Sequence, residues 1–347
     1  MRARGAGGAH EMKTESLPTS SPAELTHAVA RSVELLTAGD PVALPTETVY
    51  GLAADATRAD AAVKIFEAKQ RPFFDPLIVH LPDLDWLERI AHPDSPLVTK
   101  LIETFWPGPL TLVLPRRNIV PDIVTSGLAT VAVRMSAHPV FRAIATAFGK
   151  PLAAPSANPF GRISPTTAQH VRDSLDGRIP LIVDGGPCAV GIESTIVSVE
   201  GNRLRILRAG PITAEELAPF GEVQFANAGA TPVAPGQLKR HYAPRTPLLL
   251  CEVWDGWQKA HPAEANETGV SRGLLAFKCG SPDRFFEKVE ILSPTGDLHE
   301  AAATLFAKLR RLDDAGLDLI LAEPVPEHGL GIAIMDRLRK AAAGSAD

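Results

Sequence analysis

Two cations, Lys69 and Arg71, stand close together in the proline-punctuated segment 69–76. The apolar run 77–81 follows at once and is typical of a buried strand. Open α/β sheets bind anionic ligands in the loops at their strand ends, so fixed cations on such a loop predict a phosphate site. For a basic pair taken alone, a solvated surface turn is the more common explanation, and that alternative stays open.

A polar triplet, 46–48, follows the apolar run 42–44 and combines two hydroxyls with the carboxylate of Glu47. It is either a turn with ordinary capping hydroxyls or a set of groups that holds a small polar substrate. His80, near the end of the run 77–81, is similarly ambiguous. A lone histidine there is usually a satisfied core residue, and its nearness to the basic loop favours a site.

Arginines end two further predicted strands. Arg134 closes the alternating segment 130–134 and shares a face with Thr130, because side chains four apart on a strand point the same way. A strand arginine is costly to bury unless it is paired, so Arg134 predicts a carboxylate or phosphate partner from the protein or from a ligand. Arg208 is another candidate phosphate cation, although a surface arginine at a strand end is the more common case.

A proline-rich loop, 155–159, supplies Ser156 and an amide, and Ser164 with the following proline is expected to open a helix that runs through Val171. Hydroxyls, amides and a helix N-terminus are donors for phosphate oxygens. Proline-rich loops without a binding role have the same composition, so that alternative stays open for this loop.

Common catalytic motifs are missing from the sequence. It contains no G-x-x-x-x-G-K-[ST], no G-x-G-x-x-G after a strand, no G-x-S-x-G and no H-E-x-x-H. Scattered cations and hydroxyls without an evident activated nucleophile favour positioning and charge stabilisation of a phosphoryl or nucleotidyl transfer over covalent catalysis.

The elements that must position these residues alternate between helix and strand, which predicts an α/β fold. The clearest helix begins with Ser21 as N-cap, has proline next and glutamate three residues after the cap, and ends at Gly39. With 347 residues, two domains are expected. We expect residues 1–20 to be a disordered extension because they are rich in glycine, arginine and serine and show no periodicity.

Composition narrows the class of protein. The net charge of −5 provides no global attraction to nucleic acid. No apolar run approaches the length of a membrane span and no apolar region opens the chain, so we expect a cytoplasmic protein without anchor or secretory signal. Cys188, Cys251 and Cys279 lie far apart, which predicts packing residues rather than disulfides or a zinc site.

Seven ordered segments resemble the YrdC-like family of threonylcarbamoyl-AMP synthases. They read PTETVYGL, KQRPFFDPLIVH, FWPGPLTLVL, TVAVR, PSANPFGRISPT, GIESTIVS and RAG, and lie between residues 45 and 210. Downstream, Pro235-Gly236 and Arg240–Pro244 resemble the linker of the family's two-domain form. The resemblance implies a YrdC-like domain with a twisted mixed sheet and a large concave crevice at 21–215, a linker over the active site at 216–245, and a smaller Rossmann-like α/β domain at 246–347.

The resemblance also implies a reaction, in which L-threonine, bicarbonate or CO₂, and ATP form threonylcarbamoyl-AMP and pyrophosphate for tRNA modification. Mg²⁺ is expected to accompany ATP, without a dedicated protein site. Downstream partners would be the tRNA threonylcarbamoyl transferase machinery, with possible direct contact to tRNA. Implied threonine contacts are Thr48, His80, Arg134, Ala154 and Ser194. Implied ATP contacts are Arg71, Asp75, Thr130, Ser156, Ser164, Arg208 and Tyr242, with Lys69 and Arg71 as the catalytic cations.

Two positions depart from the family pattern, since Asp75 and Asp336 stand where the family often has asparagine. A carboxylate at Asp75 would repel phosphates unless it holds Mg²⁺ or a ligand hydroxyl.

Two other functions were weighed. One is an O-carbamoyltransferase like the YrdC-type domain of hydrogenase maturation proteins, whose cysteine-rich zinc modules and acylphosphatase-like domain this sequence lacks. The other is an RNA-binding module that uses a basic concave face.

Overall fold

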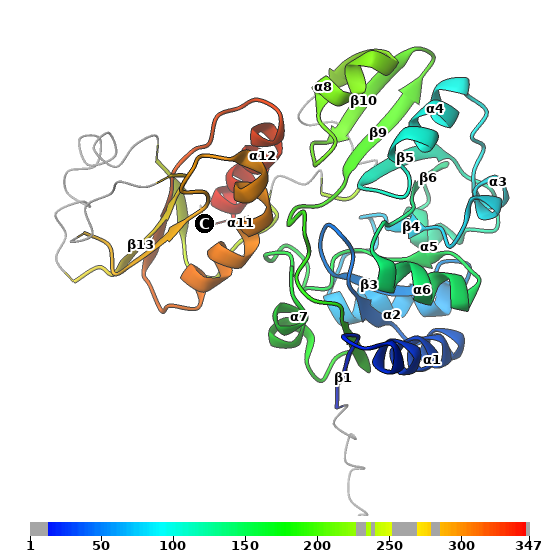
Figure 1. Cartoon of the computed structure of the whole chain (residues 1–347), viewed down its shortest axis with the longest axis horizontal. Helices are drawn as coiled ribbons and strands as arrows, with labels where there is room; N and C mark the ends of the chain where they lie inside the picture. Colours follow the sequence, from blue (N-terminus) through cyan, green and yellow to red (C-terminus); the bar gives the residue numbers. More distant parts are fainter. Residues whose placement is uncertain (1–12, 227–233, 237–239, 252–268, 279–284, 345–347) are drawn as a thin grey trace, which may run out of the picture.

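The computed structural model describes residues 13–226, 234–236, 240–251, 269–278 and 285–344. Within these ranges the strands form two sheets, one of eleven strands and one of four. Figure 1 shows them as a larger and a smaller domain side by side, with helices α11 (Leu298–Asp313) and α12 (Leu330–Ala343) on the side of the smaller domain that faces the larger one. The predicted mixed α/β architecture is confirmed.

The large sheet is mixed, with strand order β1-β8-β2-β3-β7-β4-β6-β5-β9-β10-β11 among the described residues. Its strands are β1 (Glu15–Pro18), β2 (Val42–Leu44), β3 (Gly51–Asp55), β4 (Ile78–His80), β5 (Leu110–Pro115), β6 (Thr130–Arg134), β7 (Leu152–Ala153), β8 (Leu181–Asp184), β9 (Thr195–Glu200), β10 (Arg203–Arg208) and β11 (Glu222–Phe225). Its helices are α1 (Pro22–Ala38), α2 (Ala59–Lys69), α3 (Leu87–Ile90), α4 (Pro96–Phe105), α5 (Asp122–Thr125), α6 (Pro139–Phe148), α7 (Ala168–Leu175) and α8 (Ala214–Leu217), with 3₁₀ turns at Leu84–Trp86 and Ala218–Phe220.

Helix α1 has the predicted ends. The hydroxyl of Ser21 accepts from the backbone N–H of Glu24, and the Glu24 carboxylate accepts from the N–H of Ser21, which completes a capping box. Gly39 ends the helix at φ 83°, a conformation that favours glycine. Helices α1 and α6 pack together over a hydrophobic cluster on one face of the sheet, and α2, α4, α5 and α7 contribute to a second, larger cluster.

The small sheet is parallel, with strand order β12-β15-β13-β14. Its strands are β12 (Leu248–Leu250), β13 (Arg272–Ala276), β14 (Lys288–Ile291) and β15 (Leu319–Ala322). The hydrophobic cluster built on α11 and α12 also contains Val49, Ile163 and Ile192 of the large domain. The two domains therefore share a core, and loops of the large domain lie at its edge.

The structure corrects the expected N-terminal extension of residues 1–20. Residues 1–12 lie outside the described ranges, but Glu15–Pro18 form β1, which pairs in parallel with β8. The Thr14 hydroxyl donates to the carbonyl of Ile179, and Leu17 is buried. A short edge strand is specified by a partner about 165 residues away in the chain, and local composition does not reveal it.

Two other expected boundaries differ from the structure. The helix expected from Ser164 begins at Ala168, where the Thr167 hydroxyl accepts from the N–H of His170 as the N-cap. The linker expected from residue 216 is helical at its start, in α8, and its residues 222–225 form β11, which extends the large sheet beside β10. Of the remaining linker, 234–236 and 240–245 are described.

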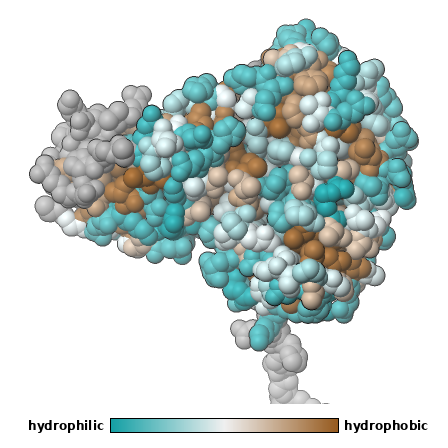
Figure 2. Space-filling view, in the orientation of Figure 1, coloured by the Kyte–Doolittle hydropathy of each residue, from teal (hydrophilic) through white to brown (hydrophobic). Residues whose placement is uncertain are grey.

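The visible face of both domains is mostly hydrophilic, with hydrophobic residues in small groups (Figure 2). No helix among the described residues has the length and apolar content that crossing a bilayer requires. Cys188 and Cys251 are buried free thiols within hydrophobic clusters, as predicted for packing residues. The same prediction for Cys279 falls outside the described residues.

The role of β1 can be measured. Leu17→Ala should lower the free energy of unfolding by about 2 kcal/mol, because it removes buried methyl groups between β1 and α1. Ser16→Ala, at an exposed position of the same strand, is the control and should change it by less than about 0.5 kcal/mol. Urea unfolding measures both, and equal stabilities for the two variants would mean that β1 is not a stabilising strand.

Candidate active site

A cleft opens where strands β4, β6, β7 and β10 end. It brings together most of the residues that the sequence singled out. Those that line it are Thr48, Arg71, His80, Arg134, Ala154, Ser156, Ser194, Arg208 and Tyr242. Because the residues come from segments spread over almost two hundred positions, their convergence is a property of the sheet topology.

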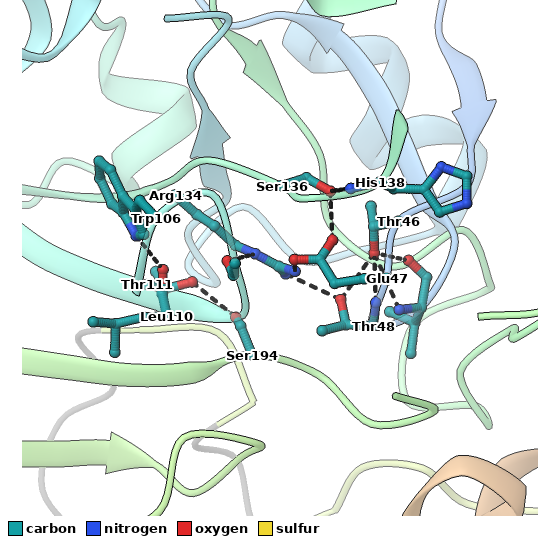
Figure 3. A network of polar contacts seen from close by, with 12 residues as sticks. Thr46, Glu47, Thr48, Trp106, Leu110, Thr111, Arg134, Ser136, His138 and Ser194 are labelled. Carbon is teal, nitrogen blue, oxygen red and sulfur yellow. Dashed lines mark hydrogen bonds and ion pairs between the residues drawn. The ribbon is translucent and has the colours of Figure 1, made fainter. Parts of the chain in front are cut away.

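Arg134 is the centre of a buried polar network (Figure 3). Its Nη2 donates to Glu47 Oε1 at 2.6 Å and its Nη1 donates to Thr48 Oγ1 at 3.0 Å. Its Nε donates to the carbonyl of Gly108 at 3.1 Å. The paired carboxylate expected for a strand arginine is thus supplied by the polar triplet 46–48 itself, which Arg134 orders.

Glu47 is fixed from two sides. Its second carboxylate oxygen accepts from the Ser136 hydroxyl at 2.5 Å. Burial alone raises the pKa of Glu47, but Arg134 and Ser136 outweigh it and lower the pKa to about 2. Thr46 shapes the turn, because its hydroxyl donates to the carbonyl of Val49 and accepts from the N–H of Thr48. The triplet is both a turn and part of the cleft wall, so the two interpretations are compatible.

His80 lies opposite Arg134 in the parallel register of β4 and β6. Its ring packs on Phe141 with centroids 4.9 Å apart, and its buried Nδ1 has no hydrogen-bond partner among the described residues. Burial first, and Arg134 second, lower the pKa of His80 to about 3. The imidazole is therefore neutral at physiological pH and presents one unused ring nitrogen beside the cleft.

Arg208 and Ser194 form the opposite wall. Nε and Nη2 of Arg208 donate to the carbonyl of Ser194 at 3.1 and 3.0 Å, and Nη2 also donates to its hydroxyl at 3.1 Å. The Ser194 hydroxyl lies 2.8 Å from that of Thr111 (Figure 3). Arg208 Nη1 donates to the carbonyl of Pro235 in the linker. Arg208 is buried, which corrects the interpretation as a surface strand-end arginine.

The two cations of the basic loop, Lys69 and Arg71, have different positions relative to the cleft. Arg71 lines the cleft and is held by the carbonyls of Asp75 and Pro76, at 3.0 and 2.8 Å, and by the Asp75 carboxylate at 2.8 Å. Lys69 does not line it, because its ammonium is buried and donates to the carbonyls of Ser156 and Asn158, both at 2.5 Å. Burial lowers the pKa of Lys69 well below its ordinary value.

Asp75, Thr130 and Ser164 also lie outside the cleft lining. Asp75 is buried beside Arg71, and burial raises the pKa of its carboxyl. Thr130 starts the strand that Arg134 ends, and the four steps along the strand from one to the other span about 13 Å. Ser164 donates to Glu193 at 2.5 Å, so its hydroxyl faces a neighbouring carboxylate.

Several cleft residues were not assigned a contact from the sequence, although some lie in the expected linker. Glu193 stands inside the segment 191–198, where an acidic residue between an apolar residue and a hydroxyl was a usable signal. Linker residues Pro235, Gly236 and His241 join Tyr242 in the lining. Tyr242 is buried at φ 62° and stacks on Phe306 of α11 with centroids 5.5 Å apart. Among the described residues, no group of three or more His, Cys, Asp or Glu could hold a metal ion.

The neutral state of His80 predicts a pH effect on stability. Its folded-state pKa lies below the unfolded value, so its contribution is complete above about pH 6.5 and is lost as the pH falls toward 3. Urea unfolding from pH 7 to 5 should show a slope for His80→Gln that is shallower than wild type by up to about 1.4 kcal/mol per pH unit. His27→Gln, at an exposed position of α1, is the control, and identical slopes for wild type and His80→Gln would contradict the assignment.

Comparisons with known proteins find relatives of both domains. Residues 34–210 match the family model described as "Telomere recombination", and residues 212–343 match the model for the threonylcarbamoyl-AMP synthase C-terminal domain. The threonylcarbamoyl-AMP synthase of Bacillus subtilis is 41% identical over 95% of this chain and 96% of its own length. The Schizosaccharomyces pombe threonylcarbamoyl-AMP synthase is 39% identical over 93% of this chain and 90% of its own.

A solved structure is similar over nearly the full length. The crystal structure of Pyrococcus abyssi Sua5 complexed with L-threonine has a TM-score of 0.85 and 39% sequence identity, and the match covers 95% of this chain and 97% of that one. The likeness spans both domains, so it includes the cleft and the domain junction.

Proposed function

Because the chain belongs to the threonylcarbamoyl-AMP synthase family in its two-domain form, we propose that the cleft described above is the place where the family's reaction occurs. The chain is a nucleotidyltransferase that converts L-threonine, bicarbonate or CO₂, and ATP to threonylcarbamoyl-AMP and pyrophosphate, for the threonylcarbamoyladenosine modification of tRNA. The observation that supports the residue roles below is the convergence of Arg71, Arg134 and Arg208 on one cleft.

Arg134 binds the threonine carboxylate in this proposal. A guanidinium has five N–H groups, one on Nε and two on each Nη. The bonds to Gly108, Thr48 and Glu47 use one N–H on each nitrogen. One N–H on each Nη is left, which suits a two-point grip on a carboxylate. Thr48 and His80 line the cleft next to Arg134, and in this proposal they contact the amino acid.

Arg71 and Arg208 bind the triphosphate, with Ser156 and Tyr242 on the nucleotide. A carbamate oxygen of N-carboxy-threonine attacks the α-phosphorus, the new O–P bond forms, and the bond from that phosphorus to the bridging oxygen breaks to release pyrophosphate. The cations stabilise the negative charge that shifts to the leaving group. We assign Lys69 to positioning, since its ammonium holds the carbonyls on either side of Ala157 and thereby fixes Ser156 in the cleft wall.

The linker covers the nucleotide in this scheme. Pro235, Gly236, His241 and Tyr242 in the cleft lining support that proposal. A mixed carbamic-phosphoric anhydride hydrolyses readily, so a cover that excludes water protects the product until it is passed on.

Further partners are also proposals. Mg²⁺ would enter with ATP and be coordinated mainly by phosphate oxygens. Both oxygens of Glu193, the carboxylate in the cleft lining, already have protein partners. The product would pass to tRNA threonylcarbamoyl transferase machinery in the cytoplasm, where ATP and tRNA are present, and direct contact with tRNA would assist that transfer.

The activity is tested by pyrophosphate release from ATP by the purified chain. Release should require both L-threonine and bicarbonate, and L-serine in place of L-threonine should support much less, because the reaction needs the carbamate of the correct amino acid. Salt-sensitive tRNA binding without any threonine-dependent release would instead favour an RNA-binding role.

Arginine substitutions test the residue roles. Arg71→Ala and Arg134→Ala should each reduce kcat/KM by at least about a hundredfold, because each removes a preorganised cation from the cleft. We expect the KM for ATP to rise most in the first variant and the KM for L-threonine in the second. Arg205→Ala, at an exposed arginine of β10, is the control.

Circular dichroism must accompany these assays, because removal of Arg134 leaves Glu47 buried without its cation. A near-normal rate in either Arg71→Ala or Arg134→Ala would remove that residue from the mechanism.

A further inference from the structure

Glu193 is a carboxylate in a cleft whose arginines favour anionic ligands. It lies in the cleft lining with Arg71, Arg134 and Arg208 and is almost fully buried. Burial alone raises the pKa of its carboxyl, but Arg337 first, then Arg208 and Ser164, lower it below the ordinary value. The group is therefore ionised, and its charge faces the space in which the phosphates of ATP bind under the function proposed above.

The main partner of Glu193 comes from the other domain. Arg337 on α12 donates from Nε to Glu193 Oε2 at 3.2 Å, while Ser164 Oγ donates to Oε1 at 2.5 Å. The Arg337 side chain is 1% exposed, although it belongs to the small domain and Glu193 to the large one. Its Nη1 donates to the carbonyl of Ala209, next to Arg208, at 2.5 Å, and to the carboxylate of its neighbour Asp336 at 3.2 Å. Lys340 also pairs with Asp336, at 2.8 Å, so that carboxylate has a cation of its own.

The position of Arg337 within its helix is unusual for a cation. It shares the buried face of α12 with Leu330, Ala333, Ile334 and Ala341. A charge at such a position costs stability unless it is paired with good geometry, so a small domain that only needed a packed helix would be as stable with an apolar residue. Its guanidinium also lies over the ring of Tyr242, 5.5 Å from the centroid.

A second contact from the small domain reaches the same loop. Gly191, two residues before Glu193, has φ 78°, and a Cβ built there would lie 2.5 Å from backbone atoms of Ala302 and Ala303 in α11. The backbone of the loop thus rests directly on α11, while its carboxylate is held by α12. Helices α11 and α12 thus both shape one wall of the cleft.

We propose that Arg337 is a positioning residue supplied by the small domain, which neutralises and orients Glu193 so that Arg208 and the Ser194 loop present a net positive wall to the triphosphate. Without Arg337, the carboxylate would repel the phosphates and compete with them for Arg208. The small domain then contributes to ATP binding through a charge, in addition to its packing.

This inference rests on the proposed function, and its test uses the full chain in the pyrophosphate assay. Arg337→Met should raise the KM for ATP at least tenfold and change the KM for L-threonine by less than threefold, because the repulsion acts on phosphates. In Glu193→Gln/Arg337→Met, the KM for ATP should return most of the way to wild type, since the uncompensated charge is gone.

Two control variants separate charge from domain docking. Arg310→Met removes another guanidinium between the domains, which donates to the carbonyl of Ile163 and not to Glu193. It should lower the melting temperature without a selective rise in the KM for ATP. Arg339→Met removes a surface pair with Glu327, two residues from Arg337 on the same helix, and should behave as wild type.

The outcomes are distinct. A wild-type chain without threonine-dependent release would refute the proposed function itself. With an active wild type, equal KM values for ATP in Arg337→Met and wild type, or no recovery in the double variant, would overturn the role of Arg337. Should Arg337→Met fail to fold, Arg337→Lys tests the same point. It keeps the charge, so its KM for ATP should stay within threefold of wild type, and a tenfold rise would overturn the proposal.

Discussion

The structure of the cleft depends on how buried cations are satisfied. Backbone carbonyls hold each of them: those of Asp75 and Pro76 hold Arg71, that of Gly108 holds Arg134, and that of Ser194 holds Arg208. A carbonyl accepts a hydrogen bond without cancelling the charge. Arg208 has only carbonyl and hydroxyl acceptors among the described residues, whereas Asp75 and Glu47 offset part of the charge of Arg71 and Arg134. The carboxylates beside them orient the guanidinium groups, and the strand ends must converge for these carbonyls to be in reach.

Packing between the two domains also helps to fix the loops of the cleft. Val49, Ile163 and Ile192 belong to loops of the large domain, yet they pack in the core of the small one. These loops are therefore packed between the two domains, which limits the freedom that loop residues usually have. In this arrangement the small domain is part of the site, because the position of Glu193 depends on α11 and α12.

The sequence predicted those features that depend on neighbouring residues in the chain. The capping box at Ser21 and the stop at Gly39 are confirmed to the residue, and the cations at strand ends are found in one cleft. Three features were missed for the same reason, since each depends on a distant partner: strand β1 on β8, the Lys69 ammonium on carbonyls 87 and 89 residues away, and Arg337 on Glu193. Of these three, only Arg337 could have been noticed in the sequence, because it is a cation on the apolar face of a helix.

Two buried polar atoms in the cleft wall depart from the rule that buried polar groups are hydrogen-bonded. His80 Nδ1 and the Tyr242 hydroxyl are buried in the cleft wall and have no hydrogen-bond partner within the described parts of the chain. Such atoms need a hydrogen-bond partner, because a buried polar atom without one costs about 1–3 kcal/mol. A polar ligand that donates to or accepts from them would supply that partner on binding. The Tyr242 ring belongs to the shared core, and His80 packs on Phe141 of the large domain, so both domains hold these atoms in place for a polar ligand.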